Sequence, residues 1–540
     1  MSGLEPIPPG LLADLGDARA YPDDPGAQRS VTHVQTHISD VFLTPGRVYK
    51  LRKAVDLGFV CFATRAERNA DCLRELTLNR RLAPDVYLGV APVFRTGGGY
   101  RIGTLSAGIE PGEADREHCV VMRRLPDGRD ALSLLGRGEL RKRHVDAVAE
   151  QVAHFHETHR LTREAHGAPQ EWLARCTEPV RANLEALTPV AGARLVPATL
   201  ERLRRRSTAF EAAEAERFEA RRRAGRGVDG HGDLHLEHVW FERDDSAPLL
   251  IDCLEFRDDL RCIDAASDVA FLAMDLDYRK RPRLAARFLR RYARSTDDFD
   301  LYSVVDYFLS YRAAVRAKVA AIVAHDATLP AARREAAAGS ARRHLRLAAR
   351  ALERPAPPCV AAMCGVVGTG KSSAAELVAD ALGEAAVIAS DRVRKRIAAR
   401  SPGPDSELYT DASKERVYQG LLERAAPIAA SGRVAVLDAT FSKRSRRARV
   451  LDFARQRSIP ALLVETRCPQ AEALSRLRRR QARGLDPSDA GPSYYAASVA
   501  ELEAPDEWPA SDRIVVDTSE RGWRGALRDA LRSWRRASLA

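Results

Sequence analysis

The chain has 540 residues, more than the roughly 250–300 at which one hydrophobic core stops growing, so at least two domains are expected. Hydrophobic residues make up 45% and charged residues 30%, a balance that excludes a wholly disordered chain. The net charge of +12 is too modest to demand a nucleic-acid partner. Nine cysteines without a C-x-x-C pair, no leader pattern and no apolar run of about 18 residues favour a cytoplasmic protein that does not enter membranes.

The first part of the chain predicts a small sheet followed by helices. A helical pattern at 65–82 interrupts the strand patterns, helices dominate from about 129 to 225, and a β-rich patch at 239–256 precedes further helices. This order is typical of an α+β domain. The strand patterns lie at 31–43, 47–51, 90–94, 100–105 and 119–125.

A domain boundary is expected near residue 357. A helical pattern at 331–354 ends in Pro355-Ala356-Pro357-Pro358, which breaks a helix and stiffens the segment after it. Beyond it, five short apolar runs alternate with helical patterns, which predicts a parallel α/β sheet. These runs lie at 359–367, 386–390, 434–437, 461–464 and 513–516.

A phosphate-binding motif follows the first of these strands. The segment Gly365-Val-Val-Gly-Thr-Gly-Lys-Ser372 fits G-x-x-x-x-G-K-[ST] and opens a helical pattern. Glycine lets backbone N–H groups approach phosphates, and Lys371 would reach the β- and γ-phosphates. The predicted Mg²⁺ ligand is Ser372, and the predicted ATP-binding residues are Gly365, Gly368, Thr369, Gly370 and Lys371.

Two acids end the following strands. Asp391, after the second strand, would lie in the ligand crevice, where it could take a proton from an attacking hydroxyl; alternatively it caps the next helix. Asp438 ends the third strand, at the place of an acid that supports Mg²⁺, or is a simple turn residue.

The helical pattern at 470–483 is rich in arginine. Arg476, Arg480 and Arg483 share one face, with Arg479 beside them. Such a face suits a lid that closes on the transferring phosphoryl group, with Arg480 and Arg483 binding ATP; read alone, it is a solvated face.

These motifs together resemble the small-molecule and polynucleotide P-loop kinases, which include gluconate-kinase-like, zeta-toxin-like and polynucleotide-5′-kinase-like proteins. The resemblance covers nearly all of 359–540. It implies that Asp391 acts on the acceptor hydroxyl and that a lid arginine clamps the phosphates. Arg394, in the same Ser-Asp-x-x-Arg segment, is expected to contact substrate. The basic run 443–449 keeps a nucleic-acid 5′-end kinase, or a toxin-like kinase, as an alternative.

The first part contains its own phosphotransfer motif, His231-Gly-Asp-Leu-His235, and Asp252 follows Asp233 by 19 residues. Phosphoryl transfer needs one carboxylate for the acceptor hydroxyl and another for Mg²⁺. The segment resembles the aminoglycoside-phosphotransferase branch of the protein-kinase-like fold over about 30–345. That resemblance implies Asp233 as the catalytic aspartate, which acts as base, Asp252 as metal ligand, and Lys50 as the phosphate-pairing lysine, ion-paired with Glu75 or, failing that, Glu67.

This half departs from the family at two places. His238 replaces the usual asparagine as a second metal ligand, although imidazole prefers softer ions than Mg²⁺. The strand pair over the phosphates has Ser39 as its expected phosphate donor in place of a glycine motif. Asp268 is expected to have a structural role, and His154, His156 and His159 are expected on a helix surface. A separate metal site of Asp233 with nearby histidines is disfavoured, because the spacing lacks an established pattern.

The sequence thus predicts an α+β protein-kinase-like domain at 1–357 and an α/β P-loop domain with a parallel sheet at 358–540. The expected function is transfer of the ATP γ-phosphate to a hydroxyl of a small polar acceptor, with Mg²⁺ and two separate nucleotide sites. Alternatively, the first half binds nucleotide as a sensor without transferring phosphate.

Overall fold

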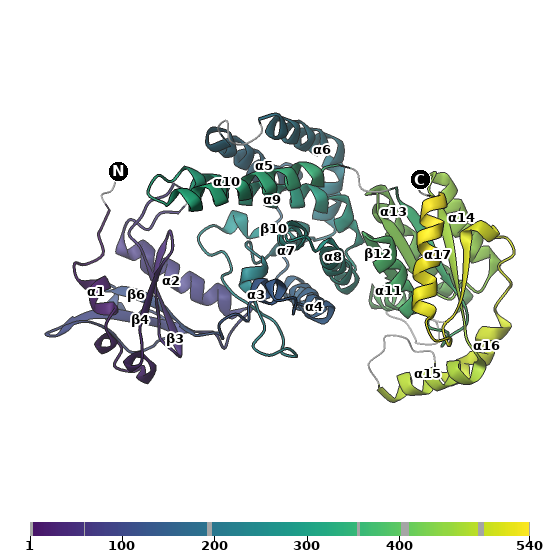
Figure 1. Cartoon of the computed structure of the whole chain (residues 1–540), viewed down its shortest axis with the longest axis horizontal. Helices are drawn as coiled ribbons and strands as arrows, with labels where there is room; N and C mark the ends of the chain where they lie inside the picture. Colours follow the sequence, from purple (N-terminus) through teal and green to yellow (C-terminus); the bar gives the residue numbers. More distant parts are fainter. Residues whose placement is uncertain are drawn as a thin grey trace. The chain divides into compact units, whose positions relative to one another are not determined.

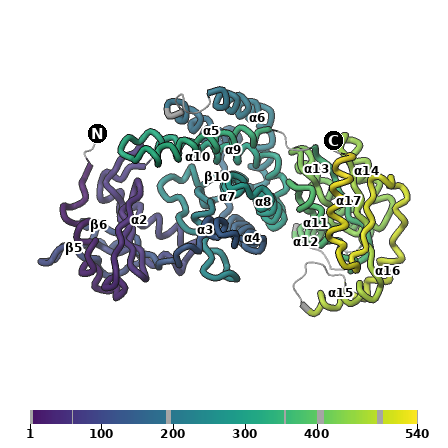
Figure 2. The backbone as a smooth tube through the Cα atoms, viewed as in Figure 1, coloured from purple at the N-terminus to yellow at the C-terminus, as the bar shows by residue number. Residues whose placement is uncertain are grey.

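A computed structural model describes residues 4–58, 60–191, 197–353, 357–400, 410–483 and 491–538 (Figures 1 and 2). The chain divides into two compact units. Unit 1 comprises Met1–Pro179 and Arg222–Asp275, and unit 2 comprises Val180–Arg221 and Leu276–Ala540. Unit 2 therefore joins helices from before residue 357 with the parallel sheet after it, and the boundary expected near residue 357 stays a prediction.

Unit 1 is built on an antiparallel sheet in the order β1-β2-β3-β6-β4-β5. The segment 31–43, expected as one strand, forms two, because Thr36 and Ser39 close a tight turn in which each backbone N–H donates to an oxygen of the other residue. The strands are β1 (Thr32–Gln35), β2 (Ser39–Leu43), β3 (Arg47–Arg52), β4 (Tyr87–Thr96), β5 (Gly99–Ile102) and β6 (Glu117–Arg123).

Helix α2 (Arg65–Arg80) covers one face of this sheet. It begins with a capping box in which Thr64 and Glu67 exchange hydrogen bonds. Its buried face, with Cys72 and Leu76, packs against apolar side chains of β4 and β6. The cap uses Glu67 at the helix start, whereas Glu75 lies on the buried side of the helix.

The rest of unit 1 is mainly helical, with two short strand pairs that frame the His231–His235 loop: β7 with β10, and β8 with β9. The strands are β7 (Gly227–Asp229), β8 (Val239–Trp240), β9 (Leu249–Leu250) and β10 (Cys262–Asp264). The helices are α1 (Leu11–Leu15), α3 (Ala131–Gly136), α4 (Lys142–Thr158), the first part of α5 (Pro169–Ala191) and nearly all of α7 (Ala265–Tyr278).

Unit 2 contains the predicted parallel sheet, in the order β12-β13-β11-β14-β15. Helices α11 and α17 pack on one face of it through a shared apolar core, and α13 and α14 contact its strands as well (Figure 1). The strands are β11 (Cys359–Cys364), β12 (Ala385–Ala389), β13 (Val434–Asp438), β14 (Ala461–Arg467) and β15 (Arg513–Asp517). The helices after them are α11 (Lys371–Leu382), α12 (Ser390–Arg400), α13 (Asp411–Ala430), α14 (Arg444–Gln456), α15 (Gln470–Arg483), α16 (Tyr495–Ala500) and α17 (Trp523–Ser538).

Within unit 2, ion pairs join helix α8 (Pro282–Thr296) to the P-loop helix α11. The Arg290 side chain, 2% exposed, places Nη2 at 2.7 Å from Asp380 Oδ1 and 3.3 Å from Glu376 Oε2. Arg294, one turn further on, contacts Glu376 at 3.1 Å. The other helices of this unit that precede the sheet are α6 (Pro197–Arg223), α9 (Val305–His325) and α10 (Ala331–Ala351).

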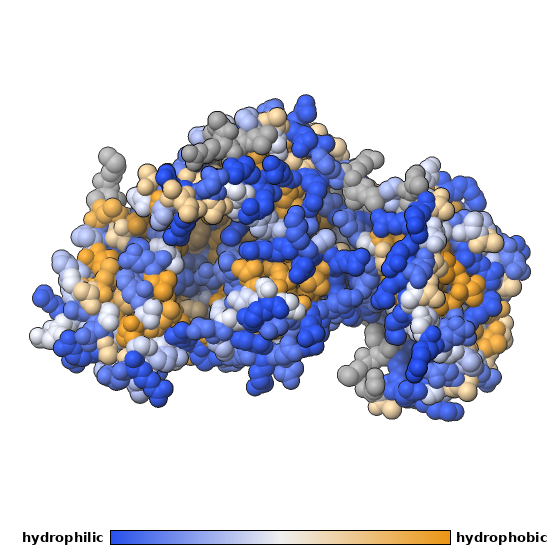
Figure 3. Space-filling model, viewed as in Figure 1, coloured by the Kyte–Doolittle hydropathy of each residue, from blue (hydrophilic) through white to orange (hydrophobic). Residues whose placement is uncertain are grey.

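The visible surface is mostly hydrophilic, and apolar side chains are scattered over it in small areas (Figure 3). Among the described residues, no helix has the length and apolarity to cross a bilayer.

Candidate active sites

The backbone of the His231–His235 loop of unit 1 is held by the side chain of Asp268, a residue of α7. The Asp268 carboxylate is fully buried and accepts hydrogen bonds from His231 N–H at 2.8 Å and Gly232 N–H at 2.9 Å. His156 Nε2 lies 2.9 Å from the same carboxylate. The structural role expected for Asp268 is confirmed. The surface position expected for His156 is wrong, because this contact faces α7 and buries the ring.

Backbone geometry requires glycine in this loop. Gly232 has a left-handed φ of 80°, and a Cβ there would lie 3.0 Å from the Leu254 side chain. The neighbouring His231 ring is buried, with Nε2 at 2.9 Å from the Ile251 carbonyl oxygen, and burial lowers the pKa of His231 to about 4. His231 is therefore neutral at pH 7, and its ring is part of the buried base of the His231–His235 loop.

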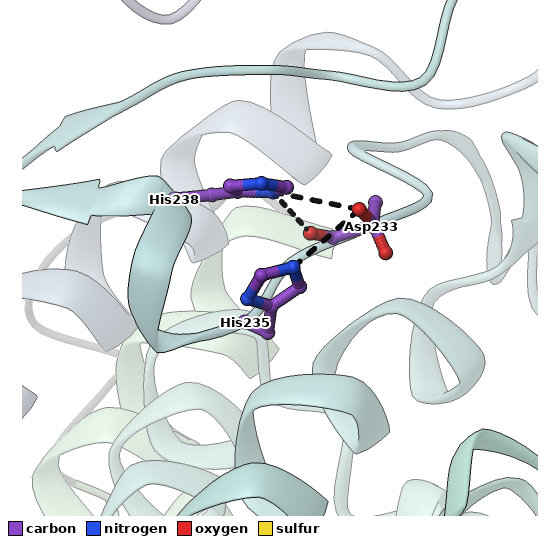
Figure 4. Close-up of side chains that lie close together, drawn as sticks. All are labelled: Asp233, His235 and His238. Carbon is purple, nitrogen blue, oxygen red and sulfur yellow. Dashed lines mark hydrogen bonds and ion pairs between the residues drawn. The ribbon is translucent and has the colours of Figure 1, made fainter. Parts of the chain in front are cut away.

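Asp233 projects from the loop with 36% of its side chain exposed, next to two histidines (Figure 4). Its Oδ2 lies 3.5 Å from His235 Nε2 and 3.6 Å from His238 Nδ1. Burial opposes ionisation, but the hydrogen bond with His235 and the charge of His238 hold the pKa of Asp233 below its usual range. At neutral pH it is a carboxylate, able to accept a hydrogen bond from a hydroxyl.

Asp252 has a left-handed φ of 60°, uncommon for a residue other than glycine. The backbone on both sides is fixed: Asp252 N–H donates to Tyr87 Oη at 3.0 Å, and Cys253 N–H donates to Asn79 Oδ1 at 2.7 Å. These bonds come from α2 and β4, so the sheet and its helix together set the position of the Asp252 carboxylate.

Lys50 joins these elements. From β3, its Nζ donates to Glu75 Oε1 at 2.9 Å and to Asp252 Oδ1 at 3.0 Å. Burial would lower the pKa of Lys50, but the Asp252 and Glu75 carboxylates outweigh it and raise that pKa. The Lys50–Glu75 ion pair expected from the sequence is confirmed; the phosphate-binding role of both residues stays a prediction.

A buried guanidinium lies behind this pair. Arg52, 1% exposed, donates to Asp71 Oδ2 at 2.6 Å and Glu75 Oε2 at 2.7 Å, and it also pairs with Glu255. Burial raises the pKa of Glu255 to about 8. Arg52 also donates to the hydroxyl of Ser39 at 2.9 Å, and Ser39 is fully buried. The phosphate contact expected for Ser39 stays a prediction, against which its burial argues.

In unit 2, the P-loop takes the expected conformation between β11 and α11. Gly365, Gly368 and Gly370 all have left-handed φ values, of 136°, 83° and 87°. A Cβ on Gly368 would lie 2.8 Å from the Ala473 carbonyl oxygen, so only glycine fits. Lys371 Nζ donates to the Val366 carbonyl oxygen of the loop at 2.8 Å, and its phosphate-binding role stays a prediction.

Hydroxyl groups fix the loop: Thr369 of the loop itself, and Thr518 and Ser498, which the sequence analysis missed. Thr369 Oγ1 donates to Val366 O, and Thr518 Oγ1 donates to Thr369 O, both at 2.8 Å. Val367 N–H donates to Ser498 Oγ at 3.2 Å. Thr518 directly follows β15, so its place at the carboxyl end of a parallel strand was a usable signal.

Asp438 lies next to Ser372 of the P-loop helix. Burial raises the pKa of Asp438, although a hydrogen bond with Ser372 and the charge of Lys371 oppose it. The metal-binding roles expected for Ser372 and Asp438 stay predictions. Asp391 lies in the first turn of α12, where Arg394 pairs with it at 2.9 Å.

The arginines of α15, expected to form a lid, have different surroundings. Arg476 is held by Glu472 at 2.7 Å and by Thr518 Oγ1 at 2.7 Å, so it supports the loop. The charge of Arg480 adds to burial in lowering the pKa of Lys371, and the ATP-binding role expected for Arg480 stays a prediction. The side chain of Arg483 lies outside the described residues.

The architecture of the chain occurs in mycobacteria. The uncharacterized protein Rv2004c of Mycobacterium tuberculosis (strain ATCC 25618 / H37Rv) is 33% identical over 513 residues, which cover 91% of this chain and 95% of the relative. The chain belongs to the same family. Mb2027c of Mycobacterium bovis matches to the same extent.

Each half of the chain matches a family model. The phosphotransferase enzyme family matches residues 47–305, and an AAA domain matches 360–505. Among solved structures, a choline/ethanolamine kinase family protein from Mesorhizobium loti is similar (12% identity, TM-score 0.35, 63% of this chain, 99% of that one). Kti12 of Chaetomium thermophilum, solved with ADP-AlF3, is also similar, with 15% identity and a TM-score of 0.27. The match covers 34% of this chain and 99% of Kti12.

These matches confirm the two predicted resemblances: an aminoglycoside-phosphotransferase-like domain precedes a P-loop kinase domain, whose five-stranded sheet is parallel. The chain is a nucleotide-dependent kinase of the phosphotransferase type.

Proposed function

We propose that this kinase has two separate ATP sites, one in each compact unit, and that each transfers the γ-phosphate to a hydroxyl of a small polar acceptor. The main support is that Lys50 in unit 1 and Lys371 in unit 2 each lie next to carboxylates in a phosphate-binding arrangement. The chain has only nine lysines among 86 basic residues, yet one occupies each site.

In unit 1, Lys50 would pair the ATP phosphates, and Asp233 would orient the acceptor hydroxyl and take its proton as the bond to phosphorus forms. Asp252 and His238 would hold a divalent ion, which neutralises developing charge on the phosphates. The fixed backbone around Asp252 and the low pKa of Asp233 support these roles, since both carboxylates are ionised at neutral pH.

In unit 2, the P-loop N–H groups and Lys371 would bind the phosphates, and Ser372 with Asp438 would hold Mg²⁺. Asp391 would act on the acceptor hydroxyl, with Arg394 orienting it and Arg480 closing on the phosphates. The Ser372–Asp438 contact supports the metal site, because it brings two oxygen ligands together.

The basic run 443–449 gives little support to the nucleic-acid alternative. Arg446 and Arg447 are buried, and their guanidiniums pair with Glu415 and Glu507. Buried, paired guanidiniums offer no phosphate-binding surface. A small acceptor is therefore the better proposal, and a cytoplasmic location is retained with it.

Incubation of the full chain with γ-labelled ATP tests the acceptor class. The panel comprises sugars, aminoglycosides, nucleosides and oligonucleotides, and we expect label in a small hydroxyl compound. Label in oligonucleotides alone, in a reaction suppressed by raised salt, would contradict the proposal.

A further inference from the structure

The two ring nitrogens of His238 face different aspartates, Asp233 (Figure 4) and Asp252. Its Nδ1 is 2.9 Å from the Asp233 carbonyl oxygen, and its Nε2 is 3.4 Å from Asp252 Oδ2. A carbonyl oxygen only accepts hydrogen bonds, so Nδ1 must donate its proton to it. In the neutral ring, Nε2 then directs a lone pair towards the Asp252 carboxylate.

The Nε2 lone pair and the Asp252 Oδ2 atom, 3.4 Å apart, are both free to act as ligands of one metal ion placed between them. Ligating histidines commonly donate the other ring N–H to a backbone carbonyl, as His238 does, because this fixes the tautomer.

The spacing fits one ion. Two ligand atoms that each lie about 2.1 Å from an ion are about 3.4 Å apart at a tetrahedral angle and about 3.0 Å apart at a right angle. Asp252 Oδ1 already accepts from Lys50, which leaves Oδ2 for the ion. The His238 ring is held in place by the His235 ring, whose centroid is 3.9 Å away.

We infer that unit 1 binds a first-row divalent transition metal ion, such as Mn²⁺ or Co²⁺, through His238 Nε2 and Asp252 Oδ2, in preference to Mg²⁺. Imidazole nitrogen suits transition metals, whereas Mg²⁺ takes oxygen ligands. Ser372 and Asp438 of unit 2 offer oxygen alone, so the two sites of one chain would use different metals. The inference rests on the proposed function, in which Asp252 and His238 hold a divalent ion, and it takes ATP phosphates as further ligands.

The test uses the full chain with Lys371→Ala and Ser372→Ala, which disable the P-loop site. Mn²⁺ and a non-hydrolysable ATP analogue are added, and electron spin-echo modulation reports any directly bound nitrogen. We expect an imidazole ¹⁴N coupling that His238→Asn abolishes and that the control His154→Asn, at an exposed position of α4, retains. In competition titrations, His238→Asn should reduce the preference for Mn²⁺ over Mg²⁺ by about tenfold or more.

Bound Mn²⁺ without nitrogen coupling, or coupling that survives His238→Asn, would overturn the inference, because His238 would then not be the nitrogen ligand. The same spectra recorded with Mn²⁺ alone separate the metal from the nucleotide. Nitrogen coupling without binding of the analogue would support the metal site and contradict the proposed ATP site instead.

Discussion

Replacement of Asp268 by asparagine tests whether a buried carboxylate holds the His231–His235 loop of unit 1 in place. Asp268 Oδ2 accepts from His231 N–H and contacts His156 Nε2, while Oδ1 accepts from Gly232 N–H. An asparagine oxygen can take the place of Oδ2, but its NH₂ group then faces the Gly232 N–H. One charge-assisted hydrogen bond, of about 1.5–3 kcal/mol, is lost, and a buried donor without a partner costs about 1–3 kcal/mol more.

We therefore expect Asp268→Asn to lower the free energy of unfolding by about 3–5 kcal/mol in urea titrations at pH 7. The phosphotransfer of unit 1, measured in a Lys371→Ala chain, should fall by about 10²-fold, because the loop that positions Asp233 shifts. Asp130→Asn is the matched control: Asp130 caps α3 by accepting from Ser133 N–H at 2.8 Å, which an amide oxygen does equally well. A loss for Asp268→Asn within 1 kcal/mol of this control would refute the reasoning.

Arg290→Ala should destabilise the full chain by about 1–3 kcal/mol in urea, because it removes the buried guanidinium that pairs with Asp380; an unchanged midpoint would contradict this. Stability should fall as pH drops from 6.5 towards 4, since the unfolded chain protonates His231 before the native one does; the cost approaches about 3 kcal/mol. His231→Gln should flatten this pH profile, and an equal slope in the variant would count against the buried neutral ring. Gly368→Ala should abolish nucleotide binding by the P-loop because its Cβ would meet a carbonyl oxygen at 2.8 Å. Gly383→Ala, also left-handed but with no atom within 4 Å of the new Cβ, should retain binding, and equal losses in the two would point to backbone strain alone.

A local pattern was sufficient for the P-loop, and the family resemblance supplied the Lys50–Glu75 pair. The G-x-x-x-x-G-K-S motif is continuous in the chain, and its strand and helix are its immediate neighbours. Glu75 was correctly preferred to Glu67, and the structure gives the reason: Glu67 belongs to the capping box of α2.

The buried polar networks could not be predicted from local sequence patterns, because the residues that form them are far apart in the chain. Ser39 meets Arg52 across the β2–β3 register, and Arg52 meets Glu255 some 200 positions away. Likewise, His156 was expected on a helix surface. The buried Arg447 belongs to the basic run 443–449, for which contact with nucleic-acid phosphates was an alternative. Both have partners on elements distant in sequence, Asp268 and Glu507, which no helical periodicity can reveal.

Phosphoryl transfer by Asp233→Asn, Lys371→Ala and the double variant, in full chains with γ-labelled ATP, tests the central claim most directly. If each unit has its own site, each single variant retains the transfer of the other unit, and the double variant loses both by at least about 10²-fold. If Asp233→Asn leaves all transfer intact while Lys371→Ala abolishes it, unit 1 senses nucleotide without transferring phosphate, and the claim of two transferase sites is contradicted.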